Sequence, residues 1–441
     1  MHDSPPIATV RNRRDELADR TLELLAHDTT NPPGETRELA DSIESWLDGL
    51  GLDTHRVVAD PAKPNLFATL SGDRDETLLF LGHLDTVPFD EREWSREPLG
   101  ERDGDRIYGR GATDMKGPMA AMLEAVRAFA VTDTTPSVGL ALGLVSDEEV
   151  AGDSGLPAVL DSGAIQTRSE GTATGSDTTI RADACVIGET TCEGGRHSMT
   201  VADRGSIWLT LTASGSGAHG SRPMLGENAI DRLYRAVETI RERFGRRELS
   251  IPDDVAWIVD ESVAYYAPAM GETAAEELFA RPTINLGTIE GGDRINSVPT
   301  TARARLDIRL APGVETPAVL ADIRACAADC AGVEIADVSW SVGTYEQRGE
   351  PIVEATGDVA RAVTGERIYR RSATGGGDAK KLRNAGIPTI EFALGTETVH
   401  AVDEYTTLDA LAANAEIYAS LPAQFAEAVA GDRVSDSAED T

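Results

Sequence analysis

The sequence predicts an α/β protein in which helices flank a mixed sheet, and three observations support this fold class. Its 441 residues exceed the size of one ordinary core and suit two domains. Apolar runs typical of buried strands alternate with helical segments, as in "TLLFLGH" (77–83) and "MAAMLEAVRAFA" (119–130). Polar residues follow the strands, so a ligand site is expected beyond their carboxyl ends.

Residues 1–197 are predicted to form the first part of a catalytic domain. This part begins with a helix pair over 11–51, which the turn-rich "TTNPPGETRE" interrupts. Strands are then expected at "NLFATL", "TLLFL", "SVGLALGLV" and "ADACVIGE". The polar segment "RSEGTATGSDTT" (168–179) is interpreted as a mobile loop.

Residues 198–345 are predicted to form an inserted α+β domain, a lid or dimerisation domain. "SIWLTLTA" alternates with a period of two, and helices near 227–244 and 317–331 separate further strands. The expected order is β-α-β-β-α-β with an antiparallel sheet. Residues 346–441 then complete the catalytic domain, with a strand "IPTIEFAL" and a last helix near 408–428.

The charge balance excludes several classes of protein. The chain carries 75 Asp and Glu against 41 Lys and Arg, a net charge of -34 at pH 7. Such a surface repels phosphate backbones and anionic lipid, so no nucleic-acid or membrane partner is expected. The same acidity is typical of proteins that work at multimolar salt, which favours a halophilic source. The N-terminus has no signal-like apolar stretch, so we expect a cytoplasmic protein whose four cysteines are free core residues.

Residues with metal-ligand chemistry stand where the predicted strands and loops end. Imidazole and carboxylate together form the donor set that zinc, cobalt and manganese accept. Each of these residues alone has an ordinary explanation, such as a core histidine or a helix cap, but their joint placement favours a metal centre. They are His83, Asp85, Asp114, Glu148, Glu149, Glu189 and His400.

Two neighbouring pairs within this set predict different roles. Strand alternation places His83 and Asp85 on the same side, so His83 can bind a metal through one ring nitrogen while the Asp85 carboxylate accepts a hydrogen bond from the other. Glu148 and Glu149 cannot easily both bind one ion. We therefore expect one of them to be a ligand and the other a general base that takes a proton from water.

A series of motifs resembles one family over nearly the full chain. "GHLDTVP", "GRGATDMKG", "SDEE", "GE", "GAHGSRPMLGENAI" and a late His followed by Asp-Glu stand in that order. The resemblance is to the co-catalytic zinc peptidases and deacylases, which include acetylornithine deacetylase, succinyl-diaminopimelate desuccinylase, aminoacylase and glutamate carboxypeptidases.

The resemblance implies two divalent metal ions, with zinc as the first choice and cobalt or manganese as alternatives. It implies that His83 and Glu189 are terminal ligands of one ion. Glu149 and His400 are then terminal ligands of the other, and Asp114 bridges the two.

The resemblance also marks residues for the substrate. His219 in "GSGAHGSRP" resembles a residue that reaches into a neighbouring subunit's site and polarises the scissile carbonyl, which implies a homodimer; the alternative is a solvent-facing turn histidine. Asn296 and Arg309 resemble positions that hold the substrate's carboxylate, and for Arg309 the alternative is a surface ion pair. The loop at Gly375 and Gly376 is interpreted as lining the substrate pocket, because it lacks the order of a phosphate-binding loop.

The expected function is metal-dependent hydrolysis of an amide bond in an N-acylated amino acid or a small peptide. Glu148 is the implied base, and the peptide bond between Asp114 and Met115 is implied to be cis. A dipeptidase or a glutamate-type carboxypeptidase is the alternative among enzymes. A non-catalytic relative that binds a ligand or serves as a scaffold would have lost a ligand or the base, and all are present. The segment 248–278 is long and departs from the family pattern.

Overall fold

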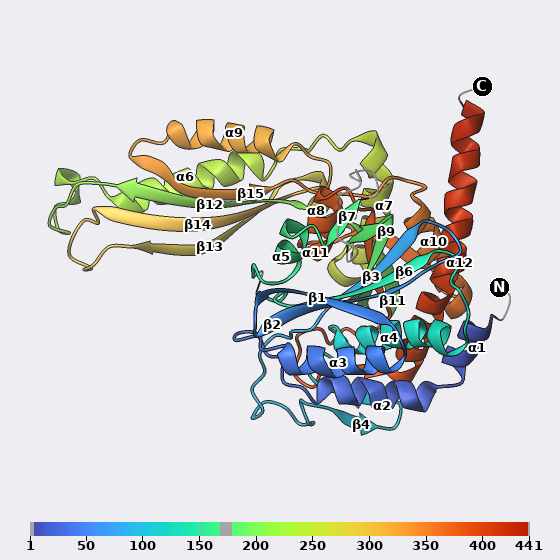
Figure 1. Cartoon of the computed structure of the whole chain (residues 1–441). Helices are drawn as coiled ribbons and strands as arrows, with labels where there is room; N and C mark the ends of the chain where they lie inside the picture. The colour runs from blue at the N-terminus through green and yellow to red at the C-terminus, as the bar shows by residue number, and fades with distance from the viewer. Residues whose placement is uncertain (1–3, 151, 168–178, 440–441) are drawn as a thin grey trace. The chain divides into compact units, whose positions relative to one another are not determined.

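The structure is a computed structural model that describes residues 4–150, 152–167 and 179–439, with side chains described as far as residue 432. The expected mobile loop therefore lies almost entirely outside the described residues. The chain folds as two compact units, each of which can be followed in Figure 1. Unit 1 comprises Met1–Val201, Glu346–Arg370 and Gly377–Thr441, and unit 2 comprises Ala202–Tyr345 and Arg371–Gly376.

A mixed sheet, nine-stranded over the described residues, forms the middle of unit 1. Its order is β1-β2-β6-β3-β9-β17-β11-β10, with β16 paired to β11. The central strands β6, β3, β9 and β17 are parallel neighbours, whereas β2 and β11 join them antiparallel. The carboxyl ends of the parallel strands therefore meet at one edge of the sheet. The strands are β1 (Asp53–Asp60), β2 (Lys63–Leu70), β3 (Thr77–His83), β6 (Gly139–Val145), β9 (Ala184–Thr190), β10 (Cys192–Glu193), β11 (Arg196–Ala202), β16 (Ile368–Ser372) and β17 (Thr389–Ala393).

Helices cover both faces of this sheet (Figure 1). On one side α4 and α10 pack against the central strands and against α12, and on the other side α5 and α11 contact each other. The last helix continues well beyond the predicted end near residue 428. The helices of unit 1 are α1 (Pro5–Arg11), α2 (Arg14–Leu25), α3 (Arg37–Gly49), α4 (Lys116–Val131), α5 (Leu156–Asp161), α10 (Pro351–Thr364), α11 (Asp378–Asn384) and α12 (Leu408–Glu439). Two small sheets complete the unit, β18-β5-β4 (Tyr405–Thr407, Arg106–Tyr108, Glu101–Asp103) and β7-β8 (Ile165–Thr167, Ile180–Ala182).

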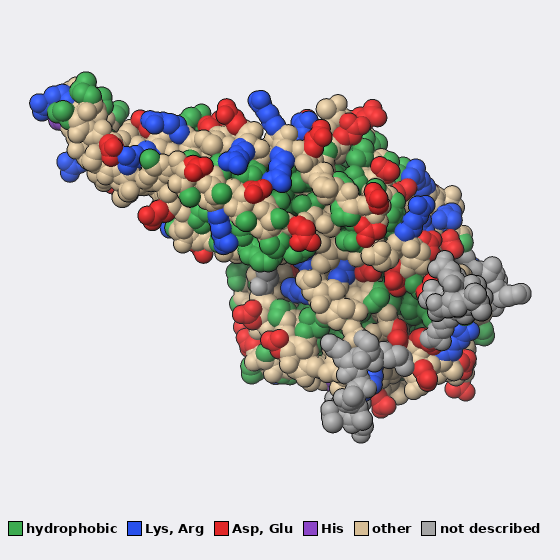
Figure 2. Space-filling view, turned by 90° about the horizontal axis from the view of Figure 1, so that it is seen from above, with side chains coloured by type: hydrophobic (Ala, Val, Ile, Leu, Met, Phe, Trp, Pro, Cys, Tyr) green, Lys and Arg blue, Asp and Glu red, His purple; other side chains and the backbone are tan. Residues whose placement is uncertain are grey.

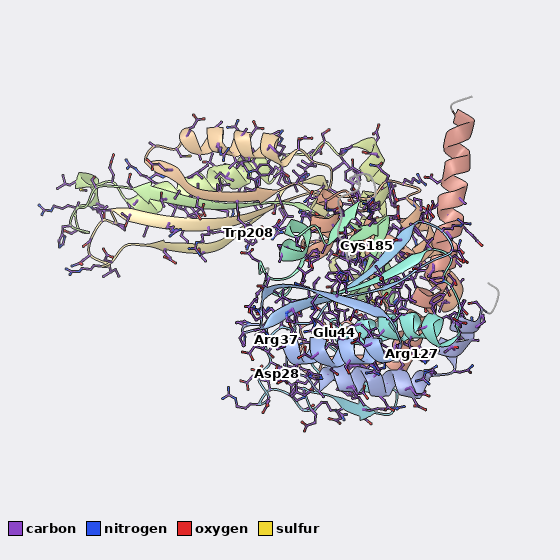
Figure 3. All side chains as sticks on the ribbon, in the orientation of Figure 1. Asp28, Arg37, Glu44, Arg127, Cys185 and Trp208 are labelled. Carbon is purple, nitrogen blue, oxygen red and sulfur yellow. The ribbon has the colours of Figure 1, made fainter. Side chains whose placement is uncertain are left out.

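The central strands are buried on both faces, which explains their unbroken apolar sequence. On one face Leu79 and Cys185, the latter labelled in Figure 3, belong to a core cluster with Leu382 of α11. On the other face Phe80 contacts Tyr418 of α12, with ring centroids 5.4 Å apart. Neighbouring residues of β3 thus face opposite layers of helices, as strand alternation requires.

Unit 2 is built on a four-stranded antiparallel sheet in the order β13-β14-β12-β15, counted over the described residues. Helices α6 and α9 pack on it. Exposed and buried residues alternate along β14 from Thr301 on, so one face of this sheet is covered and the other is open. The antiparallel sheet of the prediction is confirmed. The elements are β12 (Gly205–Ser214), α6 (Ala229–Phe244), β13 (Thr283–Gly291), β14 (Thr301–Leu310), α9 (Thr316–Ala328) and β15 (Val333–Ser341).

The segment 248–278 folds as two helices that the predicted element order did not include. α7 (Asp253–Met270) and α8 (Glu272–Ala280) lie between α6 and β13 in the chain and pack against each other. α7 also binds the end of β16, because Ser372 N–H donates to Ser262 Oγ at 2.9 Å and Tyr266 Oη donates to the Ser372 carbonyl at 3.1 Å. Residues 371–376 group with unit 2, whereas the sequence placed them in the catalytic domain.

The surface agrees with the acidic composition. Figure 2 shows Asp and Glu side chains spread over the visible face with Arg and Lys among them. All four cysteines are free, and two of them, Cys185 and Cys326, are buried. Within the described part of the chain, no helix combines the length and the apolar character of a membrane span.

Candidate metal centre

Five predicted ligands lie where unit 1 brings the ends of its strands together. His83 is the last residue of β3, Glu149 follows β6, and Glu189 lies near the end of β9, so the parallel strands align all three. Asp114 lies in the loop before α4, and His400 lies in the turn before β18. The strand order therefore collects side chains that are far apart in the sequence.

The Asp114 carboxylate lies between the two imidazoles. Its Oδ1 is 3.1 Å from His83 Nε2, and its Oδ2 is 3.1 Å from His400 Nε2. Each imidazole also has a carboxylate of its own, since Glu189 Oε1 lies 3.4 Å from His83 Nε2 and Glu149 Oε2 lies 3.2 Å from His400 Nε2. The cluster thus has two halves that share Asp114. We name them the His83 half (His83 and Glu189) and the His400 half (His400 and Glu149).

This donor set fits divalent metal ions. Each half offers an imidazole nitrogen and carboxylate oxygens, which are ligands that zinc and related ions accept. Ligand atoms of His83, Asp114 and Glu149 all lie within 4.8 Å of one another. Glu149 Oε1 is buried and has no hydrogen-bond partner among the described residues, which is costly unless a cation is bound on that side. A carboxylate shared by two ligand pairs is the arrangement that a two-metal site requires.

Burial and mutual contacts determine the charges of the cluster. Hydrogen bonds to Asp114 and Glu149 raise the pKa of His400 to about 10. Burial, together with the nearby charge of Asp114, raises the pKa of Glu189 well above the usual value of a glutamate. Burial also opposes ionisation of Asp114, but the hydrogen bonds from both imidazoles outweigh it and lower the Asp114 pKa. Several carboxylates in one buried space repel one another, and divalent cations offset such repulsion.

Asp85 supports the cluster differently from the sequence expectation. His83 Nδ1 donates to the backbone carbonyl of Asp85 at 2.9 Å, whereas the Asp85 carboxylate oxygen Oδ1 is 3.7 Å from Nδ1. The carboxylate instead accepts the backbone N–H groups of Glu148 and Glu149, both at 3.2 Å, and the Asn31 amide at 2.8 Å. Asp85 therefore orients the imidazole through its backbone and holds the turn after β6 through its side chain.

Sequence reasoning missed the polar residues that hold this turn. Asn31 Nδ2 donates to Asp85 and, at 3.0 Å, to Asp147 Oδ1. Lys63 Nζ donates to the same Asp147 oxygen at 2.5 Å. Asp147 has a φ of 66°, a left-handed conformation that Asp tolerates better than most residues. The available signal was the turn-rich segment around Asn31, which was interpreted only as a break between helices.

A second missed pair, Arg110 and Glu404, is buried next to the loop that carries Asp114. The signal for Glu404 was present, because it is the Glu of the late motif in which Asp-Glu follows His. The loop that Glu404 contacts includes the Asp114–Met115 peptide bond, which is cis, as the resemblance implied.

Glu148 lies next to the cluster with its carboxylate unengaged, since it has no hydrogen-bond partner among the described side chains and backbone groups. Burial raises the pKa of Glu148 to about 7, and the negative charge of Asp378 adds to the effect while His83 opposes it. Gly377 comes close to this carboxylate, because a Cβ at Gly377 would lie 3.4 Å from Glu148 Oε1. A carboxylate with these properties beside a ligand pair is a candidate general base.

Unit 2 brings together two of the predicted substrate residues. His219 is exposed and bridges to Ser297, and the next residue, Gly220, donates its N–H to the Asn296 carbonyl at 2.6 Å. His219 Nδ1 lies 2.8 Å from Ser221 Oγ. This contact orients the ring and leaves Nε2 available for a ligand.

Arg309 lies apart from His219 and Asn296. The register pairs Arg309 with Ser206 at one end of β14, whereas the strand begins at Thr301, close to the Asn296 loop. Thr301 and Arg309 are separated by roughly 26 Å at the usual rise per residue. The Arg309 guanidinium instead pairs with Asp307 at 2.7 Å, which is the surface ion pair that the sequence left as the alternative.

The glycine-rich loop at Gly375 and Gly376 is exposed and groups with unit 2. A Cβ at Gly375 would meet nothing within 4 Å, so packing does not require glycine there. The following Gly377, in unit 1, comes close to Glu148 of the predicted site.

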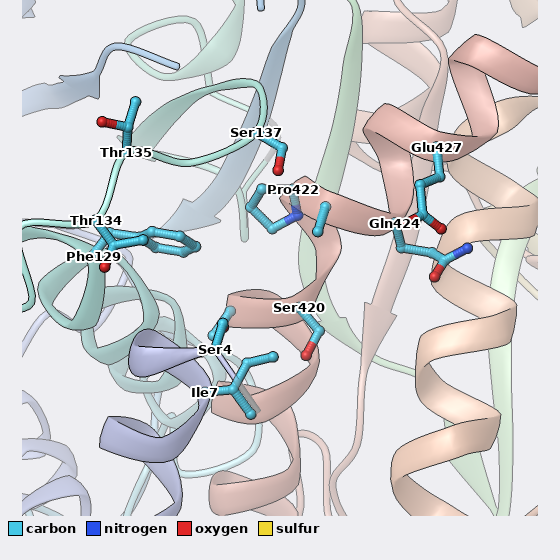
Figure 4. A pocket seen from close by; sticks show the side chains of 12 residues that line it. Ser4, Ile7, Phe129, Thr134, Thr135, Ser137, Ser420, Pro422, Gln424 and Glu427 are labelled. Atoms are coloured by element: carbon cyan, nitrogen blue, oxygen red, sulfur yellow. The ribbon is translucent and has the colours of Figure 1, made fainter. Parts of the chain in front are cut away.

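A prominent cavity of unit 1 lies away from the cluster. It has a volume of about 540 Å³ and is formed by α1, α4, α12 and the loop before β6 (Figure 4). Ile7, Phe129 and Pro422 contribute apolar surface, and Glu427 is the charged residue of its lining. No convergent set of catalytic groups lines it, so the strand-end cluster is the better candidate for the active site.

Comparison with known proteins places this geometry in context. The sequence profile described as peptidase family M20/M25/M40 matches residues 79–424, which include every residue of both halves. The chain is 31% identical over 394 residues to a succinyl-diaminopimelate desuccinylase of Rhodospirillum centenum, and the match covers 86% of this chain and 91% of that protein.

Two solved structures share the fold and confirm the predicted fold class. One is an M20 family metallo-carboxypeptidase of Sulfolobus solfataricus, 20% identical, with a TM-score of 0.73 and coverage of 93% of this chain and 100% of that chain. The other is a dinuclear metal binding peptidase of the M20 family from Bacillus subtilis, 14% identical, with a TM-score of 0.61 and coverage of 93% and 98%. At these identities the likeness concerns the fold alone.

Proposed function

The chain belongs to peptidase family M20/M25/M40 and is a metal-dependent hydrolase, and from this premise we propose that it cleaves the amide bond of an N-acylated amino acid. The desuccinylase relative supports a deacylase, an enzyme that releases an amino acid from its acyl group. The observation that carries the proposal is the Asp114 carboxylate, whose two oxygens each face an imidazole that has a further carboxylate of its own.

In this proposal the two halves hold two divalent ions. His83 and Glu189 hold one ion, His400 and Glu149 hold the other, and Asp114 contacts both. Zinc is the first choice because it accepts both imidazole and carboxylate, and cobalt or manganese are the alternatives. Such ions, when bound, polarise a carbonyl oxygen and make water more acidic.

Glu148 is the proposed general base. Its burial and its pKa of about 7 suit a group that takes a proton from water near neutral pH and then gives it to the leaving nitrogen. The Asp85 carboxylate accepts hydrogen bonds from the backbone N–H groups of Glu148 and Glu149. The proposed base and the proposed ligand therefore keep a fixed position relative to each other. Positioning of this kind is expected to raise the rate.

We further propose that the enzyme is a homodimer in which His219 of the partner subunit polarises the scissile carbonyl and Asn296 binds the substrate's carboxylate. His219 belongs to unit 2, whereas every proposed metal ligand belongs to unit 1. Met224, Leu225 and Ile295, at the same loops as His219, are 78%, 68% and 105% exposed, and such apolar side chains favour contact with another chain.

Gly375 and Gly376 remain proposed as lining of the substrate pocket. Arg309 also remains proposed as a residue that binds the substrate's carboxylate, and its contact with Asp307 is the alternative role. A dipeptidase or a glutamate-type carboxypeptidase is the second candidate function.

A substrate screen tests the proposed activity. The purified protein, supplied with Zn²⁺, Co²⁺ or Mn²⁺, is assayed on N-succinyl and N-acetyl amino acids, on dipeptides and on peptides that end in glutamate. We expect an N-acyl amino acid to give the highest kcat/KM. Faster cleavage of a dipeptide or a glutamate-terminated peptide would replace the deacylase by a peptidase, and no hydrolysis of any substrate would contradict the proposal as a whole.

A subunit-mixing experiment tests the role of His219. Two inactive variants, His219→Ala and Glu148→Gln, are mixed under conditions of subunit exchange. In a hybrid dimer, one site combines an intact Glu148 with the partner's intact His219, so activity should return at about a quarter of all sites. A mixture that demonstrably contains hybrids and stays inactive would show that His219 does not act across subunits.

A further inference from the structure

Glu404 is a buried carboxylate whose hydrogen bonds all go to the chain around Asp114. Its Oε1 accepts the backbone N–H groups of Thr113 at 2.9 Å and of Asp114 at 3.0 Å. Its Oε2 accepts the Gly111 N–H at 3.0 Å and Arg110 Nη1 at 2.7 Å. One side chain thus holds most of the loop that delivers the shared carboxylate.

Arg110 extends this contact to the second imidazole. While Nη1 donates to Glu404, Nη2 donates to the backbone carbonyl of His400 at 3.4 Å. The backbone also joins the two segments, since Gly109 N–H donates to the Glu404 carbonyl at 2.9 Å and Tyr108 pairs with Tyr405 across β5 and β18. The Asp114 loop and the His400 turn therefore behave as one cross-linked piece.

The His400 half needs such support more than the His83 half does. His83 is 2% exposed, lies at the end of a buried strand, and has its Nδ1 hydrogen-bonded to the Asp85 carbonyl. The His400 side chain is 50% exposed, and its Nδ1 has no hydrogen-bond partner among the described residues. A metal-binding imidazole ordinarily has a partner that fixes its orientation.

We propose that Arg110 and Glu404 are positioning residues that set the distance between Asp114 and His400 and so determine the affinity of the His400 half for its metal ion. The proposal rests on the two-metal function given above. Neither residue contacts the proposed substrate or ions; both act through the backbone of the ligands. Both are also enclosed, with Glu404 0% and Arg110 4% exposed, so the loss of either leaves the other as an uncompensated buried charge.

Glu404→Gln is the direct test, because the amide keeps the shape but can accept hydrogen bonds at one atom only. Its NH₂ group would then face the donors of Arg110 and Gly111. The readout is Zn²⁺ affinity, measured by chelator competition with the metal content counted by mass spectrometry. The variant is combined with His83→Ala, which isolates the His400 half, and with His400→Ala, which isolates the His83 half.

We expect Glu404→Gln to lower Zn²⁺ affinity about 10- to 100-fold in the His83→Ala background, the usual effect of removing a supporting residue. In the His400→Ala background the loss should be clearly smaller. Equal losses in the two backgrounds, or a larger loss in the His400→Ala background, would overturn the proposal.

The chain offers a matched control in a second buried ion pair. Arg383 and Glu346 are 4% and 8% exposed, and Glu346 likewise accepts a backbone N–H, that of Thr389, at 2.7 Å. The partners described for the Glu346 carboxylate are Arg383 and Thr389, and neither is a ligand of the cluster. Glu346→Gln should lower the melting temperature and leave Zn²⁺ affinity at the wild-type value. If Glu346→Gln lowers Zn²⁺ affinity as much as Glu404→Gln does, the loss of affinity results from general destabilisation of the protein, and the inference fails.

A milder variant keeps the test decisive if Glu404→Gln does not fold. Arg110→Lys retains the positive charge beside Glu404 but cannot donate to Glu404 and the His400 carbonyl at once. We again expect a larger loss of Zn²⁺ affinity in the His83→Ala background than in the His400→Ala background, although both losses should be smaller than with Glu404→Gln. Equal losses in the two backgrounds would overturn the proposal. Wild-type protein that binds fewer than two Zn²⁺ ions would instead overturn the two-metal function itself, so the two failures are distinguishable.

Discussion

The two halves of the cluster are chemically alike and structurally different. Each pairs one imidazole with one glutamate and shares Asp114. Yet His83 ends a buried parallel strand and is 2% exposed, whereas His400 lies in a turn with a φ of 59° and is 50% exposed. The sheet itself places the His83 half and the strand before Glu149, while contacts between neighbouring loops place His400.

This difference teaches that the same ligand types need not bind with the same strength. A ligand on a rigid strand keeps its position at little cost, whereas a ligand on an exposed turn depends on the groups that hold the turn. We therefore expect the His83 half to bind its ion more tightly. The predictions below test this comparison, from the largest effect to the smallest.

Glu148→Gln should give the largest effect, because Glu148 belongs to neither half and is the proposed proton carrier. We expect kcat to fall at least about 100-fold, the lower end of general-base effects, with metal content unchanged in both halves. Steady-state kinetics and metal analysis of one preparation provide the measurement. A smaller loss of kcat would remove Glu148 from the role of base.

Glu149→Gln should affect metal binding in the His400 half and spare the His83 half. The change removes a proposed direct ligand, so the loss of Zn²⁺ affinity there should exceed the roughly 10- to 100-fold effect of losing a supporting residue. Chelator competition should then show one weak and one normal ion per chain. If Glu149→Gln retains both ions while Glu148→Gln loses one, the roles of the two glutamates must be exchanged.

Asp85→Asn should weaken the His400 half more than the His83 half, because the change alters the side chain and keeps the backbone. The Asp85 carbonyl, which accepts from His83, is retained, whereas the carboxylate that accepts the N–H groups of Glu148 and Glu149 is replaced by an amide. We expect losses of about 10-fold in kcat and in Zn²⁺ affinity, near the lower end of supporting-residue effects. An effect confined to the His83 half would instead favour the carboxylate–imidazole contact that the sequence suggested.

Glu350→Gln should give the smallest effect and leave metal binding in both halves unchanged. Burial, with help from the charges of Glu346 and Asp432, raises the pKa of Glu350 to about 7. A carboxyl with a raised folded-state pKa contributes stability that is complete below its unfolded pKa and is lost as the pH rises through about 7. The variant cannot ionise, so its melting temperature should exceed that of wild type at pH 8 and match it at pH 4.

Thermal melts at these two pH values, with metal content measured alongside, check the Glu350 prediction. An equal shift at both pH values would contradict the ionisation argument. A change in the metal content of the Glu350→Gln variant would mean that residues outside the two halves also influence metal binding.

Much of the fold, and the closeness of the five proposed ligands, could be predicted because the signals are local. The apolar runs before His83 and Glu149 predicted buried strands. The ordered motifs implied which residues are ligands. The helices α7 and α8 were not predicted, because the segment that forms them departs from the family pattern that guided the rest of unit 2.

The sequence by itself determined which residues have side chains that can bind a metal and which of them stand near the ends of predicted strands, since both are properties of short segments. Only the tertiary structure decided what holds them. The Asp85 carboxylate meets the turn at Glu148, 63 residues away, and Arg110 meets Glu404, 294 residues away. Periodicity reports which face of an element is buried, but it does not report which distant element covers that face. That depends on the strand order and on the paths of the loops, so the partners of Asp85 and Arg110 appear only when the chain is folded.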